Sequence, residues 1–275
     1  MLFFLHIPKT GGTTFQFILE NSLGPAHCHL GHLGKQVVDQ RDLEFARKFF
    51  PWLRSLAGES LVDPLRLSVP DPFYITFLRE PVARAFSHYQ DEVLRGGKTL
   101  TFEEMLNTQD VLENTQVKRL AGQADLGRAK LVLEKFHFVG LTEKFDLSLH
   151  MLGKICPVRL NYNYKRKVTA RDNAIKRSLE SDSRLVDMTR EKNRLDSELY
   201  DFAVKELFPK FCAQTGYSAT EKVASFDRYR SEIRPGFLLH RLYNQTLFRN
   251  VCKLYKKRRA REIVRLREPE PVETT

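Results

Sequence analysis

The sequence predicts an α/β protein in which helices flank a parallel β-sheet. Two segments carry the same succession of a short apolar strand, a loop and an amphipathic helix, and a third strand with its own helix follows later in the chain. Strands that alternate with helices favour a parallel sheet with helices on its faces. With 275 residues, of which 42% are hydrophobic, the chain is long enough to enclose one large core.

The first unit occupies residues 2–23. The apolar run LFFLHI at residues 2–7 is ended by Pro8, as expected for a fully buried strand. Residues 9–14 are the predicted loop. A helix is predicted to begin at Thr13 or Thr14 and to end before Gly24-Pro25, because its apolar residues are spaced for one buried face: Phe15, Ile18, Leu19 and Leu23.

The second unit begins with the strand FYITFL at residues 73–78. Arg79-Glu80-Pro81 follows this strand, and a helix is then predicted over residues 82–93 from the spacing of its apolar positions. Further along, residues 136–141 are predicted as a strand, residues 142–152 as its helix, and residues 193–208 as a long helix.

The positive charge is concentrated near the carboxyl end. Residues 228–267 contain 13 basic and 2 acidic residues, which equals the formal net charge of +11 for the whole chain. We therefore predict one α/β domain over residues 1–225 and a basic helical appendage over residues 226–275 that ends in a disordered acidic stretch. One face of this helix is expected to carry its apolar residues: Leu238, Leu242, Phe248, Val251 and Leu254.

The composition excludes several classes of protein. No stretch approaches the ~20 consecutive apolar residues of a membrane-spanning helix, and residues 1–7 lack the features of a signal peptide, so a cytoplasmic chain is expected. The four cysteines have neither metal-ligand nor disulfide-scaffold spacing, so we expect buried free thiols and no metal site.

The segment KTGGTT at residues 9–14 is typical of an anion-binding loop. Its glycines let the backbone fold around a phosphate, and the helix that follows points its N–H groups at the anion. In a nucleoside triphosphatase a lysine follows the last glycine, whereas here Lys9 precedes Gly11 and Gly12. A nucleotide kinase or other phosphoryl transferase remains the alternative, although such an enzyme normally also brings a metal-binding carboxylate.

A second anion-binding segment follows the strand at residues 73–78. Arg79 leaves the carboxyl end of that strand, and Ser87 lies eight residues later, two turns into the next helix. An arginine and a serine hydroxyl in this arrangement can converge on one anion, with charge-assisted hydrogen bonds from the guanidinium.

The segments IPKTGGTT at 7–14 and LREPVARAFSHY at 78–89 resemble two motifs of the sulfotransferases that use 3′-phosphoadenosine 5′-phosphosulfate. Within that family they are most similar to the carbohydrate group that includes the heparan sulfate 2-O- and 6-O-sulfotransferases. The resemblance spans roughly residues 3–211 and implies a sulfotransferase-type fold with a P-loop-like parallel sheet. The basic appendage lies outside it.

The resemblance also implies roles for particular residues. The loop would hold the 5′-phosphosulfate through Lys9, Thr10, Gly11, Gly12, Thr13 and Thr14, with Lys9 also touching the bridging oxygen. Arg79 and Ser87 would hold the 3′-phosphate. The implied co-substrate is 3′-phosphoadenosine 5′-phosphosulfate, and no metal is required.

Sulfuryl transfer needs a base, because the acceptor hydroxyl loses its proton as it attacks. Histidine titrates near neutral pH, and His27, His29 and His32 lie close together in the sequence. The family has Gly-His or His-Gly-His at this point of the chain. Gly31-His32 matches best and His29 second, so both histidines remain candidates for the base. Nothing nearby completes a zinc site with the three histidines.

Three further stretches resemble the family more loosely. They are residues 114–122, 138–145 and 193–200, and the last two are expected to be structural. Residues 165–167, Lys-Arg-Lys, are similar to a basic loop that closes over the 3′-phosphate in related enzymes, but a solvated run of charges is the preferred interpretation.

The resemblance implies a carbohydrate acceptor, and a soluble enzyme acting on a sugar hydroxyl of a glycan or glycolipid fits the sequence best. No nucleic acid partner is expected. Three interpretations of residues 228–267 stay open: contact with an anionic membrane surface, collection of an acidic polysaccharide, or a solvated helix packed on the domain. The first would make a cytoplasmic protein peripheral to the membrane. A non-enzymatic binding module based on this segment is the third functional hypothesis.

Overall fold

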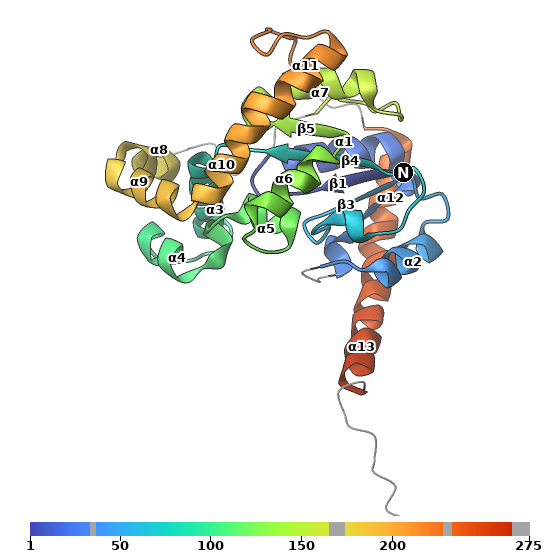
Figure 1. Ribbon diagram of the computed structural model, residues 1–275. Helices are drawn as coiled ribbons and strands as arrows, with labels where there is room; N and C mark the ends of the chain where they lie inside the picture. Colours follow the sequence, from blue (N-terminus) through green and yellow to red (C-terminus); the bar gives the residue numbers. More distant parts are fainter. Residues whose placement is uncertain (34–36, 165–173, 228–232, 266–275) are drawn as a thin grey trace, which may run out of the picture.

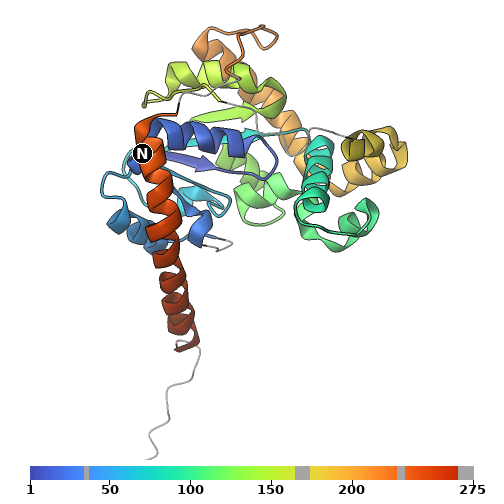
Figure 2. The same ribbon diagram turned by 180° about the vertical axis from the view of Figure 1, so that it is seen from behind.

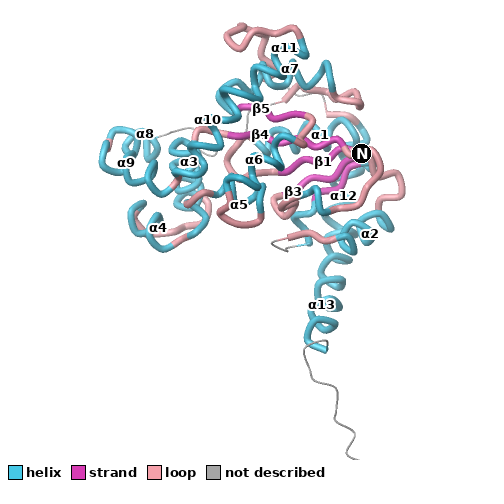
Figure 3. Tube along the Cα trace, viewed as in Figure 1, coloured by secondary structure: helices cyan, strands magenta, loops and turns pink. Residues whose placement is uncertain are grey.

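The computed structural model describes residues 1–33, 37–164, 174–227 and 233–265. Within them, five parallel strands form one sheet in the order β2-β3-β1-β4-β5 (Figures 1 and 3). The strands are β1 Leu2–Leu5, β2 His27–His29, β3 Ser55–Gly58, β4 Phe73–Leu78 and β5 Phe138–Leu141. The predicted α/β class with a parallel sheet is confirmed.

The centre of the sheet is the apolar run at the amino terminus. All four residues of β1 are fully buried, as is typical of a parallel strand with helices on both sides. β1 pairs with β3 on one side and with β4 on the other, so that Leu2 lies opposite both Ser55 and Phe73.

Helices cover both faces of the sheet. α1 (Gly12–Leu23) and α12 (Pro235–Tyr243) lie on one face, in front in Figure 2, while α5 (Thr115–Ala121), α6 (Leu126–Glu134) and α10 (Arg194–Phe202) lie on the other, in front in Figure 1. The helix that directly follows β1 therefore covers one face, and three helices that come after β4 in the chain cover the opposite face. In such a sheet a crevice opens at the carboxyl ends of the two adjacent strands, where ligands bind.

The remaining helices complete the domain. They are α2 Gln40–Phe49, α3 Pro81–Leu94, α4 Phe102–Thr108, α7 Phe145–Ile155, α8 Ala174–Ser181, α9 Ser183–Lys192, α11 Phe208–Thr215 and α13 Arg249–Arg265, with π turns at Ala203–Leu207 and Asn244–Phe248. α3, α4, α8 and α9 form a lobe beside the sheet with its own apolar cluster, which includes Phe86, Phe102, Met105 and Leu179 (Figure 1).

Most predicted elements are confirmed, but β2 and β3 are not indicated by the sequence pattern. Two of the three residues of β2 are histidines, and β3 contains neither a β-branched nor an aromatic residue. Both strands form because pairing across the sheet and burial override weak local preference. No helix among the described residues is long and apolar enough to cross a membrane.

The carboxyl-terminal helix divides its predicted apolar residues by exposure. Of the five residues expected on one face, Phe248 is buried, whereas Leu238, Leu242 and Leu254 are exposed. Phe237 and Cys252 are buried with Phe248. The π turn at Asn244–Phe248 adds a residue to one turn and so rotates the second half of the helix relative to the first.

The boundary predicted between residues 225 and 226 stays a prediction, although α12 packs against α1 of the main domain. The predicted acidic end, residues 266–275, lies outside the described residues. Of the four cysteines, Cys28, Cys212 and Cys252 are buried and Cys156 is half-buried, all as free thiols.

Candidate active site

The loop between β1 and α1 is sharply bent at Lys9 and Gly11. Both have a left-handed backbone, with φ of 70° and 85°. This conformation suits glycine but costs a lysine about 1–2 kcal/mol. Two hydrogen bonds hold the bend: the Arg79 Nη1 donates to the Lys9 carbonyl at 3.0 Å, and the Thr10 hydroxyl donates to the Ile7 carbonyl at 2.9 Å.

The two glycines leave the end of α1 open. Gly11 is the N-cap residue and has no side chain that could cover the helix end. A Cβ on Gly12 would lie 1.8 Å from Cδ2 and 2.2 Å from Nε2 of the His6 ring, so only glycine fits between the ring and the helix. The first N–H groups of α1 and the positive end of its dipole are therefore available to an anion.

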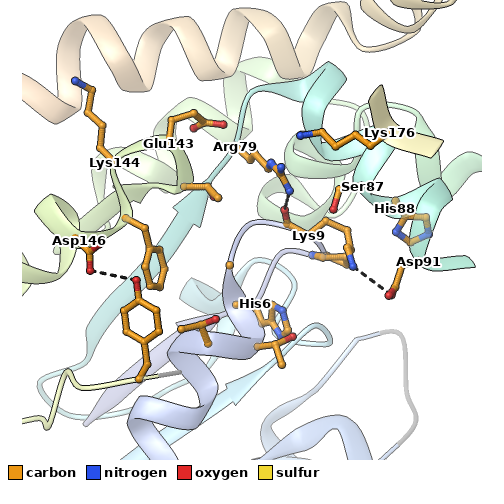
Figure 4. A pocket seen from close by; sticks show the side chains of 18 of the residues that line it. His6, Lys9, Arg79, Ser87, His88, Asp91, Glu143, Lys144, Asp146 and Lys176 are labelled. Atoms are coloured by element: carbon orange, nitrogen blue, oxygen red, sulfur yellow. Dashed lines mark hydrogen bonds and ion pairs between the residues drawn. The ribbon is translucent and has the colours of Figure 1, made fainter. Parts of the chain in front are cut away.

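A cavity of about 970 Å³ opens where β1, β4 and β5 end (Figure 4). It is lined by seven of the eight residues predicted to bind the co-substrate: Lys9, Gly11, Gly12, Thr13, Thr14, Arg79 and Ser87. Thr10 is the exception. Its fully buried hydroxyl bonds within the loop, so this side chain holds the shape of the loop and does not line the cavity.

The two predicted anion-binding segments touch each other. Arg79 follows β4, and its guanidinium reaches the carbonyl of Lys9 in the neighbouring loop (Figure 4). Ser87 comes from α3, which begins at Pro81 and is capped by the Glu80 carboxylate, an acceptor for the N–H groups of Val82 and Ala83. One wall of the cavity thus combines a guanidinium, a hydroxyl and an open helix end. That this wall binds a nucleotide stays a prediction.

A chain of buried polar groups fixes the backbone of Arg79. The Gln116 side chain accepts a hydrogen bond from the Arg79 N–H at 3.0 Å and donates one to the Arg79 carbonyl at 2.8 Å. Gln116 lies at the start of α5, where the buried Asp196 of α10 accepts the N–H groups of Gln116 and Val117 at 3.0 and 2.8 Å. α10 therefore positions Arg79 through α5.

Lys9 is paired with a carboxylate that the sequence analysis does not single out. Its Nζ lies 3.2 Å from Oδ2 of Asp91, whose Oδ1 lies 3.1 Å from Nε of Arg95 (Figure 4). Burial lowers the pKa of Lys9, and Asp91 opposes that shift. Asp91 is four residues after Ser87, so helical spacing from Ser87 was the available signal for placing it on the same face of α3.

The cavity is lined by charges of both signs. Glu143 and Asp146 follow β5, where they accept hydrogen bonds from the hydroxyls of Tyr200 and Tyr164. Around the glycine loop, Lys176 of α8 points toward Arg79 and Ser87 (Figure 4). Lys9, Arg79 and Lys176 supply cationic donors around the glycine loop, where Asp91 also lies. These donors fit a ligand with separated anionic groups.

Two histidines of the cavity were also missed. His6, at the end of β1, is 9% exposed, and burial lowers its pKa to about 3, with a smaller contribution from His29. His88, next to Ser87, has its pKa lowered to about 4 by burial and by Arg84. Both imidazoles are neutral near pH 7. The position of His6 directly before the glycine loop was the signal for it.

The two candidate bases, His29 and His32, and their neighbour His27 lie in β2 or just after it, on the outermost strand next to β3. His27 is fully buried and bonds to Gln16 at 2.7 Å and Ser55 at 3.1 Å, so it is structural. His29 ends β2 and is half-buried, and although it influences His6, it is not among the residues that line the cavity. The backbone of His32 lies in the turn Leu30–Leu33, and its side chain lies outside the described residues.

The segments expected to be structural divide into two kinds. In 193–200, Asn193 accepts the Asn114 N–H at 3.0 Å, which confirms a structural role beside that of Asp196. In 138–145, residues 142–145 line the cavity, and the Thr142 hydroxyl also bonds to the carbonyls of Thr10 and Leu78, so a structural role for this half stays a prediction. The basic run 165–167 lies outside the described residues. In the described part of the chain, no group of three or more His, Cys, Asp or Glu side chains is placed to hold a metal ion.

Known proteins include relatives of this chain in sequence and in structure. Residues 1–203 match the family described as the sulfotransferase family. The chain is 27% identical over 276 aligned positions to the heparan-sulfate 6-O-sulfotransferase 2 of Gallus gallus, covering 76% of this chain and 66% of that protein. A sulfotransferase structure from Alicyclobacillus acidocaldarius aligns with a TM-score of 0.42 and 17% identity, over 79% of this chain and 96% of that one. Because the family match covers most of the chain, this protein belongs to the sulfotransferase family, whose members transfer sulfate.

Proposed function

We propose that the protein transfers the sulfuryl group of 3′-phosphoadenosine 5′-phosphosulfate to a hydroxyl group of a carbohydrate. The observation that carries the proposal is the contact between Arg79 and the carbonyl of Lys9, which joins the glycine loop and the Arg79–Ser87 segment in one cavity. A carbohydrate acceptor is supported by the name of the chicken relative, a heparan-sulfate 6-O-sulfotransferase.

Each anionic group of the donor has a matching set of protein groups. The open end of α1, with Thr13 and Thr14, suits the 5′-phosphosulfate. Arg79 and Ser87 suit the 3′-phosphate, because a guanidinium and a hydroxyl donate hydrogen bonds to a phosphate at once. Lys9 lies in the loop itself, where its ammonium can balance charge on the oxygen that bridges sulfur and phosphorus.

The proposed reaction is an in-line displacement at sulfur. The acceptor oxygen forms a bond to sulfur while the bond from sulfur to the bridging oxygen breaks, and the electron pair of that bond stays on the phosphate. His32 or His29 accepts the proton of the acceptor hydroxyl. The products are a sulfate ester and 3′-phosphoadenosine 5′-phosphate. Lys9 and the helix end stabilise the charge that develops on the phosphate oxygen.

The first experiment is calorimetric binding of 3′-phosphoadenosine 5′-phosphate, with and without a chelator, with ADP and ATP as comparison ligands. We expect binding that does not depend on metal, that exceeds the binding of ADP, and that weakens in Arg79→Ala. Absence of binding, or a preference for ATP with magnesium, would overturn the proposal in favour of a phosphoryl transferase.

A second experiment tests the charge at the loop. Loss of one group that stabilises developing charge typically lowers turnover by ~10²–10³, and we expect that loss for Lys9→Ala. The matched control is Lys210→Ala, which removes an exposed lysine of α11 far along the chain. Equal rates in the two variants would remove Lys9 from the mechanism.

A third experiment separates the two candidates for the base. His29→Ala and His32→Ala are compared for turnover and for binding of 3′-phosphoadenosine 5′-phosphate. The base is the histidine whose loss lowers turnover while nucleotide affinity stays unchanged, because a base acts on the acceptor and not on the nucleotide. If neither variant loses turnover, the histidine hypothesis is wrong.

A further inference from the structure

The helix near the carboxyl end presents a leucine-rich surface that the described residues leave exposed. α12, the π turn Asn244–Phe248 and α13 form one continuous helix, and α13 extends away from the body of the molecule (Figures 1 and 2). We call the following set the leucine face: Leu238, Leu239, Leu242, Leu247 and Leu254, which are 59%, 66%, 61%, 51% and 67% exposed.

This exposure is concentrated and not scattered. Twelve large apolar side chains of the described residues are exposed, and six of them fall between residues 233 and 254. Single exposed leucines are common on protein surfaces, whereas a cluster on one element marks an interaction site.

The opposite side of the same helix is firmly attached to the domain. Phe237 packs on Phe17 with ring centres 5.4 Å apart, and the Tyr255 ring stacks on Phe45 at 3.8 Å. The Tyr255 hydroxyl also donates to Asp42 at 2.9 Å. Because these contacts fix the rotation of the helix, the leucine face has a fixed outward direction.

The π turn brings the two halves of the leucine face to the same side. In a regular α-helix, at about 100° per residue, Leu254 would lie about 160° around the axis from Leu238. Because the π turn contains one extra residue, Leu254 lies where residue 253 of a regular helix would lie. That direction is about 60° around the axis from Leu238. The leucines therefore share one sector instead of two.

Exposed basic side chains accompany the leucines. Arg241, Arg249, Lys253 and Lys257 are exposed on the same helix. The surrounding segment, residues 228–267, carries 13 basic and 2 acidic residues. Two copies of such a surface would repel each other, and leucines add nothing to the binding of nucleic acid phosphates. Leucines flanked by cations match a bilayer surface, which offers hydrocarbon below a layer of anionic headgroups.

We propose that the leucine face docks the protein on the surface of an anionic phospholipid bilayer. The helix would lie along the surface with its leucines among the acyl chains and its cations at the headgroups, while the contacts of Phe237 and Tyr255 hold the domain to it. This proposal does not depend on the reaction that the cavity performs.

The test is sedimentation of the full chain with vesicles of phosphatidylcholine alone and of equal parts phosphatidylcholine and phosphatidylglycerol. We expect binding to the mixed vesicles, weaker binding at high salt, and little binding to phosphatidylcholine alone. The variant Leu238→Ser/Leu242→Ser is expected to bind mixed vesicles at least about tenfold more weakly, because it lacks two of the leucines that would enter the acyl chains. The matched control is Leu131→Ser on α6, where a leucine is 56% exposed outside this helix.

Circular dichroism and thermal unfolding show whether each variant is folded. The proposal is overturned if the folded wild-type chain does not bind the mixed vesicles, or if the double variant binds them as well as the control does. It is also overturned if the chain forms a dimer instead and the double variant abolishes that dimer. A further contrary result is that heparin displaces the chain from vesicles while the leucine substitutions leave vesicle binding unchanged.

Discussion

Replacing Gly12 by alanine tests the geometry of the anion loop most directly. The added Cβ would lie 1.8 Å from Cδ2 of His6, far inside the 3.0 Å below which such contacts are essentially never found. The His6 ring cannot easily move aside, because it is 9% exposed and stacks on Phe4 with ring centres 5.7 Å apart. Forcing an extra methyl group into a packed site costs about 1–3 kcal/mol.

For a domain of this size that cost corresponds to a fall in Tm of roughly 2–12 °C. The assay is urea unfolding followed by circular dichroism, together with calorimetric binding of 3′-phosphoadenosine 5′-phosphate. We expect Gly12→Ala to lose stability and nucleotide affinity together, since a displaced His6 or a displaced helix end distorts the same loop. The control is Gly127→Ala on α6, where the nearest atom to the new Cβ is an Asp125 oxygen at 3.5 Å. Stability there should stay unchanged or rise, because alanine favours helix.

A double-mutant cycle identifies the cause. If the methyl group clashes with the ring, Gly12→Ala should cost little stability in a chain that already carries His6→Ala. The double variant should then lose at least about 1 kcal/mol less free energy of unfolding than the two single variants lose in sum. Additive losses would show that His6 is not what requires glycine at position 12. A Gly12→Ala protein as stable as wild type would refute the packing argument altogether.

Three further predictions concern the groups around the loop. Gln116→Ala should weaken binding of 3′-phosphoadenosine 5′-phosphate about fivefold, because Arg79 loses the side chain that bonds both its N–H and its carbonyl; unchanged calorimetric affinity would contradict this. Asp91→Asn should strengthen nucleotide binding by roughly 3–10-fold at low salt and less at high salt, since a carboxylate beside Lys9 repels the anion; salt-independent affinity would argue against it. The pKa of His6 is about 3 in the folded chain and 6.5 ordinarily, so below pH 6.5 the unfolded chain binds a proton that the folded chain does not. The free energy of unfolding should therefore fall as the pH drops from 6.5 toward 3, by up to about 1.4 kcal/mol per unit from this group, and urea titrations of His6→Ala should show a smaller slope.

The sequence by itself determined the local parts of this protein. The segment LFFLHIPKTGGTT at residues 2–14 contains a buried strand, a loop with two glycines and the start of a helix. Each of these elements can be predicted from residues that are close together in the sequence. The strand before Arg79 and the helix with Ser87 are local in the same way. Seven residues of these two segments line one cavity, because parallel strands bring the loops at their carboxyl ends to one edge.

Only the tertiary structure decided the features that join distant parts of the chain. Gly12 is required by the ring of His6, Lys9 is paired with Asp91, and Arg79 is held by Gln116. Spacing can place Asp91 on the same face of α3 as Ser87, but it does not report which residue of another element that face meets. The same reason explains why the apolar residues of the last helix divide between a buried side and an exposed side. Which side of a helix is buried depends on what the domain offers it, here Phe17 and Phe45, and a single π turn is enough to rotate the pattern.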